Sequence, residues 1–359
     1  MLKIGDPAPW FVAPTTSNPA FHFSSVAGRH VVLCFFGSAR DAAVQRLLDQ
    51  VRNRTDLFDG IRAAFCGVSN DADDARAGRL AEQDPAVRFF QDFQGGLANR
   101  YGLVQSASLS RASLLLDPRL RVLEVLPLAD PDAHAEALLA LVAALPAAPA
   151  PGPAPVLVVP RVFEPAFCRS LIAFYDGIGG KDSGFMQTDP ATGQTIGVID
   201  HAQKSRRDVL IEDEALRTEI RTRIERRLVP EIRRAFQYEA TRIERYIVAC
   251  YDAREGGHFR AHRDNTTKGT AHRRFAVTLN LNAEDYDGGD LRFPEFGPQT
   301  YRATTGGAVV FSCSLLHEAM PVTRGRRYCL LPFLYDEAAA RLREENLKYL
   351  APDPLIATA

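Results

Sequence analysis

The 359-residue sequence has no excess of charge of either sign, because 43 lysines and arginines stand against 44 aspartates and glutamates. A near-neutral chain offers no overall electrostatic attraction to nucleic acid or to an anionic membrane surface. No apolar run approaches the roughly 18 residues that span a bilayer, and the longest candidate, residues 135–145, is too short. We therefore expect neither a nucleic acid nor a membrane as a partner.

The sequence also lacks the marks of a secreted protein. Its first residues, MLKIGDPAPWF, show no charged region followed by an apolar segment, so we expect no signal peptide. No two cysteines form a CxxC pair, and most lie in apolar, strand-like runs, where a cysteine acts as a small buried hydrophobe. The cysteines are Cys34, Cys66, Cys168, Cys250, Cys313 and Cys329. Together these features predict a reducing, cytoplasmic location rather than a disulfide scaffold.

A proline- and alanine-rich stretch divides the sequence. PAAPAPGPAP (146–155) favours an extended conformation and cannot build a hydrophobic core. A chain of 359 residues is also long enough for about two domains. We therefore place a first domain at 1–147, a linker at 148–155 and a second domain at 156–359.

The first domain alternates short apolar runs with amphipathic ones. HVVLCFFG (30–37) and AAFCGVS (63–69) are suited to buried strands, and RASLLLDPRLRVLEVLPL (111–128) predicts two strands joined by a turn at Asp117-Pro118. Apolar residues at helical spacing predict helices between and after these strands. The expected helices cover 41–51, 72–83 and 131–145. Strands that alternate with helices indicate an α/β layer fold.

This domain resembles the thioredoxin-like redoxins, in particular the peroxiredoxins. The matching segments are the GDPAPWF opening, VVLCFFG followed by a helix, FCGVSND, FQDFQGGLANRYGL and SLLLDPRLRVLEV. They extend over nearly the whole domain, and the resemblance implies an α/β thioredoxin fold.

The resemblance stops at the catalytic loop. A peroxiredoxin carries its peroxidatic cysteine after the VVLCFFG-type strand, in a Pro-x-x-x-Thr-x-x-Cys loop, whereas this chain has Ser38, Ala42 and Gln45 at the corresponding positions. Without a thiolate there is no nucleophile for peroxide or disulfide chemistry. We therefore expect a non-catalytic domain that recruits the substrate, a carrier protein or a partner protein.

The second domain changes from helical to strand-like patterning. Residues 177–205 are polar and without periodicity, which predicts a long loop. The basic cluster KSRRD (204–208) near its end is either a solvated surface patch or a clamp for a substrate anion. Glu212–Phe236 has apolar residues at every fourth position, typical of an amphipathic helix that Pro230 kinks or splits. Short strand-like runs after Thr241 favour an antiparallel sandwich or barrel.

Three potential metal ligands lie in this strand-rich part. His262 and Asp264 are two residues apart, so in an extended backbone both side chains project to the same side. His317 follows the apolar run GAVVFSCSLL, from which a neighbouring strand could supply a third ligand. Two histidines and one carboxylate are the ligand set of non-haem iron(II) centres. Arg327, ten residues later, is either a surface arginine on a hairpin or a group that holds a carboxylate by two charge-assisted hydrogen bonds. His272 lies in a polar loop and is expected at the surface.

These segments resemble the prolyl 4-hydroxylase-type iron(II)/2-oxoglutarate oxygenases. The matching motifs are YDAREGGHFRAHRDN, TLNLNAEDYDGGDLRFPEF and LLH followed by PVTRGRRY. The resemblance covers about 156–335 and implies a double-stranded β-helix, or jelly roll, with flanking helices. It implies that His262, Asp264 and His317 are the iron ligands and the catalytic centre.

The same resemblance implies the cosubstrate contacts. Arg327 falls where the family binds the C5 carboxylate of 2-oxoglutarate, and Tyr251 and Asn280 fall at positions that often contact this cosubstrate. Asn280 departs from the tyrosine found there in some members. GGDLRFP (288–294) matches a turn-strand signature that we interpret as structural.

The implied activity is that of a dioxygenase which hydroxylates an unactivated C–H bond and releases succinate and CO2. It requires Fe(2+), 2-oxoglutarate and O2, with ascorbate as a candidate reductant. The family oxidises amino-acid, peptide or protein, and small-molecule substrates, and nothing in the sequence chooses among them. A non-enzymatic binding or scaffold protein is the alternative, and a thiol peroxidase is opposed by Gln45.

Overall fold

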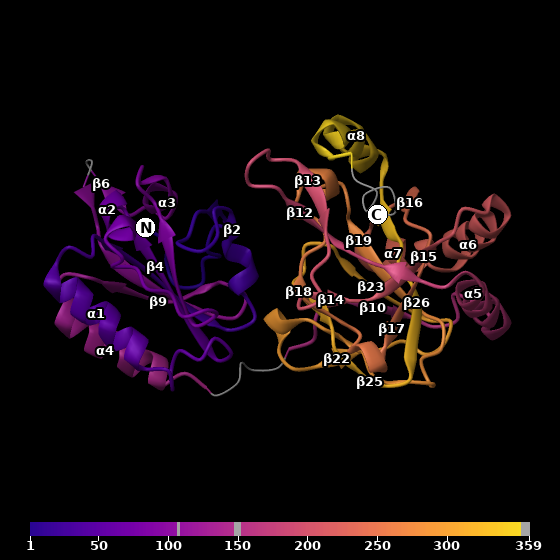
Figure 1. Ribbon diagram of the computed structural model, residues 1–359, viewed down its shortest axis with the longest axis horizontal. Coiled ribbons are helices and arrows are strands. Elements are labelled where there is room, and N and C mark those ends of the chain that lie inside the picture. The colour runs from indigo at the N-terminus through magenta and orange to yellow at the C-terminus, as the bar shows by residue number, and fades with distance from the viewer. Residues whose placement is uncertain (106–107, 147–151, 353–359) are drawn as a thin grey trace. The chain divides into compact units, whose positions relative to one another are not determined.

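The computed structural model describes residues 1–105, 108–146 and 152–352 (Figure 1). The described chain forms two compact units, the first made of the residues up to Gly152 together with Pro294–Gly297 and the second of the remaining described residues. Half of the predicted linker, residues 148–151, lies outside the described residues. None of the described helices is long and apolar enough to cross a membrane.

The first unit is built on a five-stranded sheet with the order β5-β4-β3-β8-β9. Its strands are β3 (His30–Gly37), β4 (Ala63–Ser69), β5 (Val87–Gln91), β8 (Ala112–Leu116) and β9 (Val122–Pro127). β3, β4 and β5 are parallel to one another, β8 runs antiparallel to β3, and β9 runs antiparallel to β8. Every residue of β3 and β4 is buried, because helices pack on this sheet. The unit has the thioredoxin-like fold that its sequence pattern predicts.

Four helices accompany this sheet: α1 (Ala42–Asn53), α2 (Ala72–Arg76), α3 (Gly96–Arg100) and α4 (Pro131–Ala143). α1 and α4 lie side by side and bury their apolar faces (Figure 1). The helix expected over 72–83 is wrong in length, because Gly78 takes a left-handed φ of 67° and ends the helical run. The remaining short strands are β1 (Val12–Ala13), β2 (Phe21–His22), β6 (Val104–Gln105) and β7 (Ser108–Leu109).

The second unit contains two antiparallel sheets, as the jelly-roll prediction requires. The larger has the order β10-β23-β19-β26-β17-β15-β11, with β16 and β27 beside it, and the smaller has the order β14-β18-β24-β21-β22. The larger sheet comprises β10 (Leu157–Val159), β11 (Lys181–Asp182), β15 (Arg207–Leu210), β16 (Arg242–Glu244), β17 (Ile247–Asp252), β19 (Phe275–Asn280), β23 (Ala308–Ser312), β26 (Arg326–Leu330) and β27 (Phe333–Tyr335). The smaller comprises β14 (Lys204–Ser205), β18 (His258–His262), β21 (Leu291–Arg292), β22 (Thr300–Tyr301) and β24 (His317–Ala319). A further pair joins β20 (Asp287–Gly288) to β25 (Val322–Arg324).

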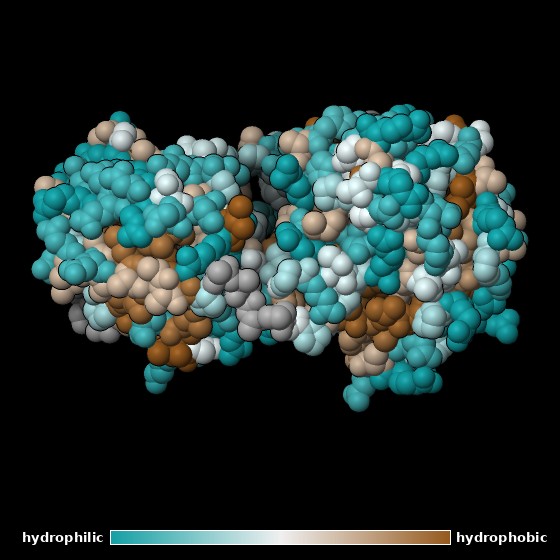
Figure 2. Space-filling view, turned by 90° about the horizontal axis from the view of Figure 1, so that it is seen from below, coloured by the Kyte–Doolittle hydropathy of each residue, from teal (hydrophilic) through white to brown (hydrophobic). Residues whose placement is uncertain are grey.

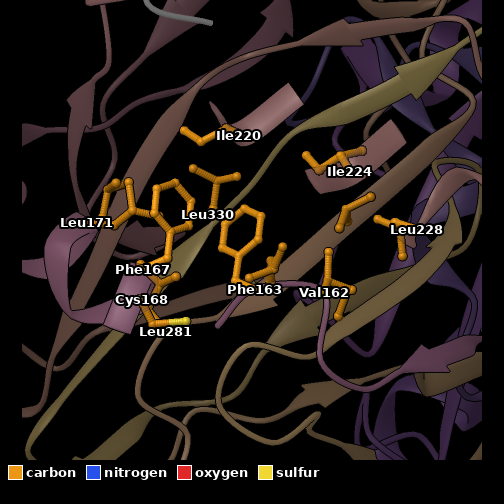
Figure 3. Close-up of a cluster of buried hydrophobic side chains, with 14 of the residues drawn as sticks. Val162, Phe163, Phe167, Cys168, Leu171, Ile220, Ile224, Leu228, Leu281 and Leu330 are labelled. Atoms are coloured by element: carbon orange, nitrogen blue, oxygen red, sulfur yellow. The ribbon is translucent and has the colours of Figure 1, made fainter. Parts of the chain in front are cut away.

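Three helices cover the outer face of the larger sheet: α5 (Pro165–Ile178), α6 (Glu214–Arg227) and α7 (Val229–Phe236). α6 ends at Arg227 and α7 begins at Val229, just before Pro230, so the predicted break in this helix is confirmed. Figure 3 shows Phe167 and Leu171 of α5 and Ile220 of α6 gathered around Leu330 of the sheet. Fully burying each such side chain contributes about 1.5–3 kcal/mol to folding. α8 (Glu337–Asn346) is the last of the described α-helices.

Strand alternation gives the larger sheet a second, inner face. On β17, Val248 and Cys250 pack toward the helices, whereas Ala249 and Tyr251 join a separate inner cluster. Phe259 of the smaller sheet belongs to the same inner cluster. The space between the two sheets is therefore where the inward-pointing residues of both converge.

The polar stretch 177–205 is not the continuous loop that its composition predicts. It contains β11, β14 and a hairpin of β12 (Phe185–Thr188) and β13 (Thr195–Val198). The Asp189 side chain shapes the turn by accepting hydrogen bonds from the Ala191 amide at 3.0 Å and the Thr192 hydroxyl at 2.6 Å. Most residues of this hairpin are only half-buried, so the strands carry little of the apolar alternation that reveals a strand in sequence.

On the face seen in Figure 2, each unit exposes mainly hydrophilic side chains and also carries smaller hydrophobic patches. Each unit buries its own hydrophobic core.

Candidate active site

His262, Asp264 and His317 lie together at one end of the smaller sheet. His262 ends β18 and His317 begins β24, and the two residues are Cα partners in the antiparallel pair. The Asp264 amide donates to the Cys313 carbonyl at 3.0 Å, which turns the chain back toward His317. One ligand atom from each of the three residues lies within 4.8 Å of the other two.

Backbone carbonyls orient both imidazoles. His262 Nδ1 is 2.7 Å from the Arg260 carbonyl and His317 Nδ1 is 3.0 Å from the Leu315 carbonyl. Because a carbonyl only accepts, each Nδ1 carries the proton and each Nε2 presents a lone pair. The two Nε2 atoms lie 3.6 Å and 3.4 Å from the oxygens of Asp264. This is the orientation that metal-binding histidines adopt.

Burial and charge prepare these groups for a cation. Burial lowers the pKa of His317 to about 4, so its imidazole is neutral at pH 7. Burial opposes ionisation of Asp264, but His317 and His262 outweigh it and hold the pKa of the carboxyl below its ordinary value. A divalent metal binds imidazole nitrogens through their lone pairs and carboxylates in the ionised form, and here both Nε2 atoms face the oxygens of Asp264. The donor set therefore fits iron(II).

Aromatic rings surround the three ligands. The Phe259 ring stacks on His262 with its centroid 3.5 Å away, and the Phe311 ring lies 4.6 Å from His317. Phe259 also belongs to the inner apolar cluster that contains Tyr251. The triad thus opens onto the inner face of the larger sheet.

Arg327 lies on that inner face and lacks a complete set of partners. It is 2% exposed, and its Nε and Nη1 have no hydrogen-bond partner among the described residues. It stands opposite Tyr251 in the β17–β26 pair, with the guanidinium 5.0 Å from the centre of the Tyr251 ring. A buried cation with free donors is costly unless an anion joins it, so this geometry suits a carboxylate ligand.

The other two predicted cosubstrate residues also face inward. The Tyr251 hydroxyl accepts a hydrogen bond from Arg206 Nη1 at 3.4 Å. Asn280 is the Cα partner of Cys329, and its Nδ2 donates to the Ala303 carbonyl at 2.6 Å. Its Oδ1 has no partner within the described part of the chain. The amide of Asn280 therefore offers an acceptor, and its donor nitrogen is already engaged.

The basic cluster 204–208 is not a solvated patch. Lys204 and Arg206 are buried, and Arg206 binds Asp208 through Nε at 2.7 Å and Nη2 at 2.6 Å. Local composition cannot distinguish this arrangement, because it arises when β14 and β15 pair with β18 and β17. Arg206 is thus a residue of the inner face that the sequence alone did not single out.

His272 is also placed differently from its prediction. It is 1% exposed rather than superficial, and its Nε2 forms a short contact with Glu244. Arg273 Nη2 binds the other oxygen of Glu244 at 2.7 Å. The polar loop around His272 can be buried because Glu244 binds the His272 and Arg273 side chains. The hydropathy of the sequence does not reveal such a partner.

The first unit has no thiolate where a peroxiredoxin has one. Gln45, at the position of the peroxidatic cysteine, donates from Nε2 to the Ala39 carbonyl at 2.8 Å. Cys34 and Cys66 are buried in strands, and burial raises the pKa of each thiol to about 12. Thiols in that state are protonated and inert at neutral pH.

Comparison with known proteins follows this division of the chain. Residues 246–335 match the model of the 2OG-Fe(II) oxygenase superfamily, and residues 4–125 match that of the AhpC/TSA family. A PKHD-type hydroxylase of Synechococcus sp. strain JA-3-3Ab is 34% identical over 98 residues, which are 26% of this chain and 43% of that protein. A PKHD-type hydroxylase of Pseudomonas putida is 39% identical over 90 residues, 23% of this chain and 39% of its own length. The chain thus matches less than half the length of these curated relatives.

Solved structures resemble each unit separately. A Pseudomonas putida prolyl-4-hydroxylase shares 19% identity and a TM-score of 0.39 over 51% of this chain and 92% of its own. The peroxidoxin BcpB from Mycobacterium tuberculosis shares 24% identity and a TM-score of 0.36 over 41% of this chain and 99% of its own. In sequence, residues 246–335 match the family model of the 2OG-Fe(II) oxygenase superfamily, and the amino-terminal residues 4–125 match that of the AhpC/TSA family.

Proposed function

We propose that the second unit is an iron(II)- and 2-oxoglutarate-dependent dioxygenase. It hydroxylates an unactivated C–H bond of an amino-acid, peptidyl or small-molecule substrate and releases succinate and CO2. The observation that carries this proposal is the pairing of a two-histidine, one-carboxylate cluster with a buried arginine, two of whose nitrogens have no partner among the described residues. The match of residues 246–335 to the 2OG-Fe(II) oxygenase superfamily supports the same activity.

The side chains of the site have separate tasks. His262, Asp264 and His317 would hold the metal, which with 2-oxoglutarate and dioxygen supplies the oxidising power for attack on a C–H bond. Arg327 binds the far carboxylate of 2-oxoglutarate through its free Nε and Nη1. Phe259 packs against His262 and excludes water from that side of the centre. Tyr251 supports the Arg327 guanidinium with its ring.

A turnover assay tests this proposal. Purified protein with iron(II), ascorbate and 2-oxoglutarate should form succinate, and His262→Ala should abolish it because one of three metal ligands is lost. His201→Ala is the matched control, since His201 is an exposed histidine whose contact with Asp182, at 3.1 Å, lies at the surface. Full turnover by His262→Ala would contradict the assignment. Wild-type protein that binds neither metal nor 2-oxoglutarate would instead favour a non-enzymatic binding protein.

We also propose that the first unit recruits the substrate or a carrier protein. Its fold is complete, yet it holds no reactive thiol among its described residues. Removal of residues 1–147 should then raise the substrate KM while leaving substrate-free 2-oxoglutarate turnover intact. An unchanged KM would contradict this role.

A further inference from the structure

One side chain fixes the backbone on both sides of Arg327. Asn282, which follows β19, donates from Nδ2 to the Arg326 carbonyl at 2.9 Å and accepts from the Tyr328 amide at 2.9 Å through Oδ1. The chain from Asn282 to Gly289 is therefore held against β26 at the position of Arg327. A side chain of this segment that points inward can therefore approach the Arg327 guanidinium.

Tyr286 is the large residue that this segment turns inward. It is 2% exposed and packs in the inner cluster with Tyr251 and Cys329. A Cβ on Gly289 would lie 3.1 Å from Cδ of Arg327 and 3.4 Å from Cε2 of Tyr286. Both side chains therefore lie beside Gly289: Arg327 with its aliphatic part, and Tyr286 with the ring edge next to its hydroxyl. Gly289, with a φ of 69°, is the residue that lets them approach.

The Tyr286 hydroxyl is buried and has no hydrogen-bond partner in the described part of the chain. Buried hydroxyls are normally bonded, and an unsatisfied one costs about 1–3 kcal/mol. Burial raises the pKa of Tyr286, so the hydroxyl keeps its proton at neutral pH and can donate. Tyr286 and Arg327, each with a donor that has no partner among the described residues, therefore lie side by side, and the Arg302 guanidinium lies over the Tyr286 ring, 4.4 Å from its centre.

The neighbouring polar groups do not offer a free hydrogen-bond donor as Tyr286 and Arg327 do. A carboxylate accepts hydrogen bonds and needs donors around it. Asn280 presents its free oxygen, because its nitrogen donates to the Ala303 carbonyl at 2.6 Å. Arg206 already binds Asp208, and Arg302, which lies over the Tyr286 ring, already binds Asp290 and backbone carbonyls. The Tyr286 hydroxyl, by contrast, has no partner among the described residues.

We propose that the Tyr286 hydroxyl donates a hydrogen bond to the distal carboxylate of 2-oxoglutarate beside Arg327. This inference rests on the proposed function and assigns one more residue to its cosubstrate site. Tyr286 acts only on the distal end of the cosubstrate, whereas the metal ligands act on the 2-oxoacid end. The two ends can therefore be tested separately with ligands that differ in one carboxylate.

The experiment compares 2-oxoglutarate with 2-oxobutyrate, which has the same 2-oxoacid group but no distal carboxylate. Both are titrated calorimetrically into full-length, Mn(II)-loaded wild type and Tyr286→Phe. A hydrogen bond to a charged group contributes about 1.5–3 kcal/mol, so the variant should bind 2-oxoglutarate about tenfold more weakly or worse. Its affinity for 2-oxobutyrate should equal that of the wild type.

Tyr238→Phe provides a matched control. The Tyr238 hydroxyl is also buried, but it lies beside Asp336 and its ring packs on the helix-covered face of the sheet. This control should bind both ligands as the wild type does. Thermal unfolding of Tyr286→Phe should show no loss of stability, since the removed hydroxyl has no hydrogen-bond partner among the described residues.

Each remaining outcome is decisive. Unchanged 2-oxoglutarate affinity in Tyr286→Phe would overturn the inference while leaving the proposed function in place. Equal weakening of both ligands would also overturn it, because the residue would then act on the metal end or on the fold. Wild-type protein that fails to bind 2-oxoglutarate would overturn the proposed function itself.

Discussion

Tyr251 and Arg327 lie opposite each other on neighbouring antiparallel strands, with the guanidinium carbon 5.0 Å from the centre of the phenol ring. Two nitrogens of this guanidinium have no hydrogen-bond partner among the described residues. The ring supports the charge but cannot replace an anion, since a cation–π contact contributes only about 0.5–2 kcal/mol. Without a ligand, the buried Arg327 guanidinium therefore lacks acceptors for two of its nitrogens among the described residues, and an anionic ligand can supply them.

Replacing Arg327 should affect ligand binding and stability in opposite directions. Arg327→Met should weaken 2-oxoglutarate binding about 100-fold, because two charge-assisted hydrogen bonds are lost. The ligand-free variant should be more stable than the wild type by about 1–3 kcal/mol, since an apolar side chain replaces an incompletely paired buried charge. Calorimetry and denaturant unfolding measure the two effects. Arg326→Met is the control, because that neighbour is exposed and pairs with Asp176, and it should change neither quantity appreciably.

Metal binding should stabilise the protein through the three clustered ligands. A ligand that binds only the folded state at 100 times its Kd adds about 2.7 kcal/mol, so Mn(II) should raise the Tm and a chelator should reverse the shift. His317→Ala should abolish this shift, because it removes one of the three donors. His201→Ala should retain it. An equal shift in all three proteins would place the metal elsewhere.

The Arg206–Asp208 pair should make stability depend on acid pH. Burial alone would raise the pKa of Asp208, but Arg206 and Lys204 outweigh it and lower that pKa to about 2. An unfolded aspartate titrates near 3.9, so the unfolded chain binds the proton first as the pH falls. The pair therefore contributes its full stability above about pH 4 and loses it as the pH falls through about 2.

Asp208→Asn tests this contribution. It should destabilise the protein by about 3–5 kcal/mol at pH 7, because Arg206 is left buried without its carboxylate. It should also flatten the fall in stability between about pH 4 and pH 2, measured by denaturant unfolding. The control is Asp287→Asn, whose pair with Arg324 is exposed and should matter little. A loss no larger than that of the control would mean that the buried pair does not stabilise the fold.

The cysteines of the first unit should be unreactive in the native protein. Cys34 and Cys66 are buried and their pKa values are raised to about 12, so neither forms the thiolate that reacts. A thiol reagent should label them only after denaturation, and the protein should not consume peroxide. Rapid native labelling that Cys34→Ser and Cys66→Ser remove would contradict this prediction.

The features that could be predicted from the sequence are those that depend on residues close together along the chain. The spacing of His262 and Asp264 puts two ligands on one side of an extended segment, and the strand-end position of His317 indicated a third. The break before Pro230 follows from proline's missing amide proton and fixed φ. The loss of a catalytic thiol is visible directly at Gln45. Each of these depends on residue type and local geometry.

By itself, then, the sequence determined the alternation of helices and strands, the three clustered ligands, the arginine ten residues beyond them and the absence of a peroxidatic cysteine. Only the tertiary structure decided which polar groups are buried. Arg206, His272 and the Tyr286 hydroxyl lie inside because strands distant in sequence pair around them. Burial of a polar group depends on the partners or ligand that satisfy it, and those partners are set by long-range pairing rather than by neighbours along the chain.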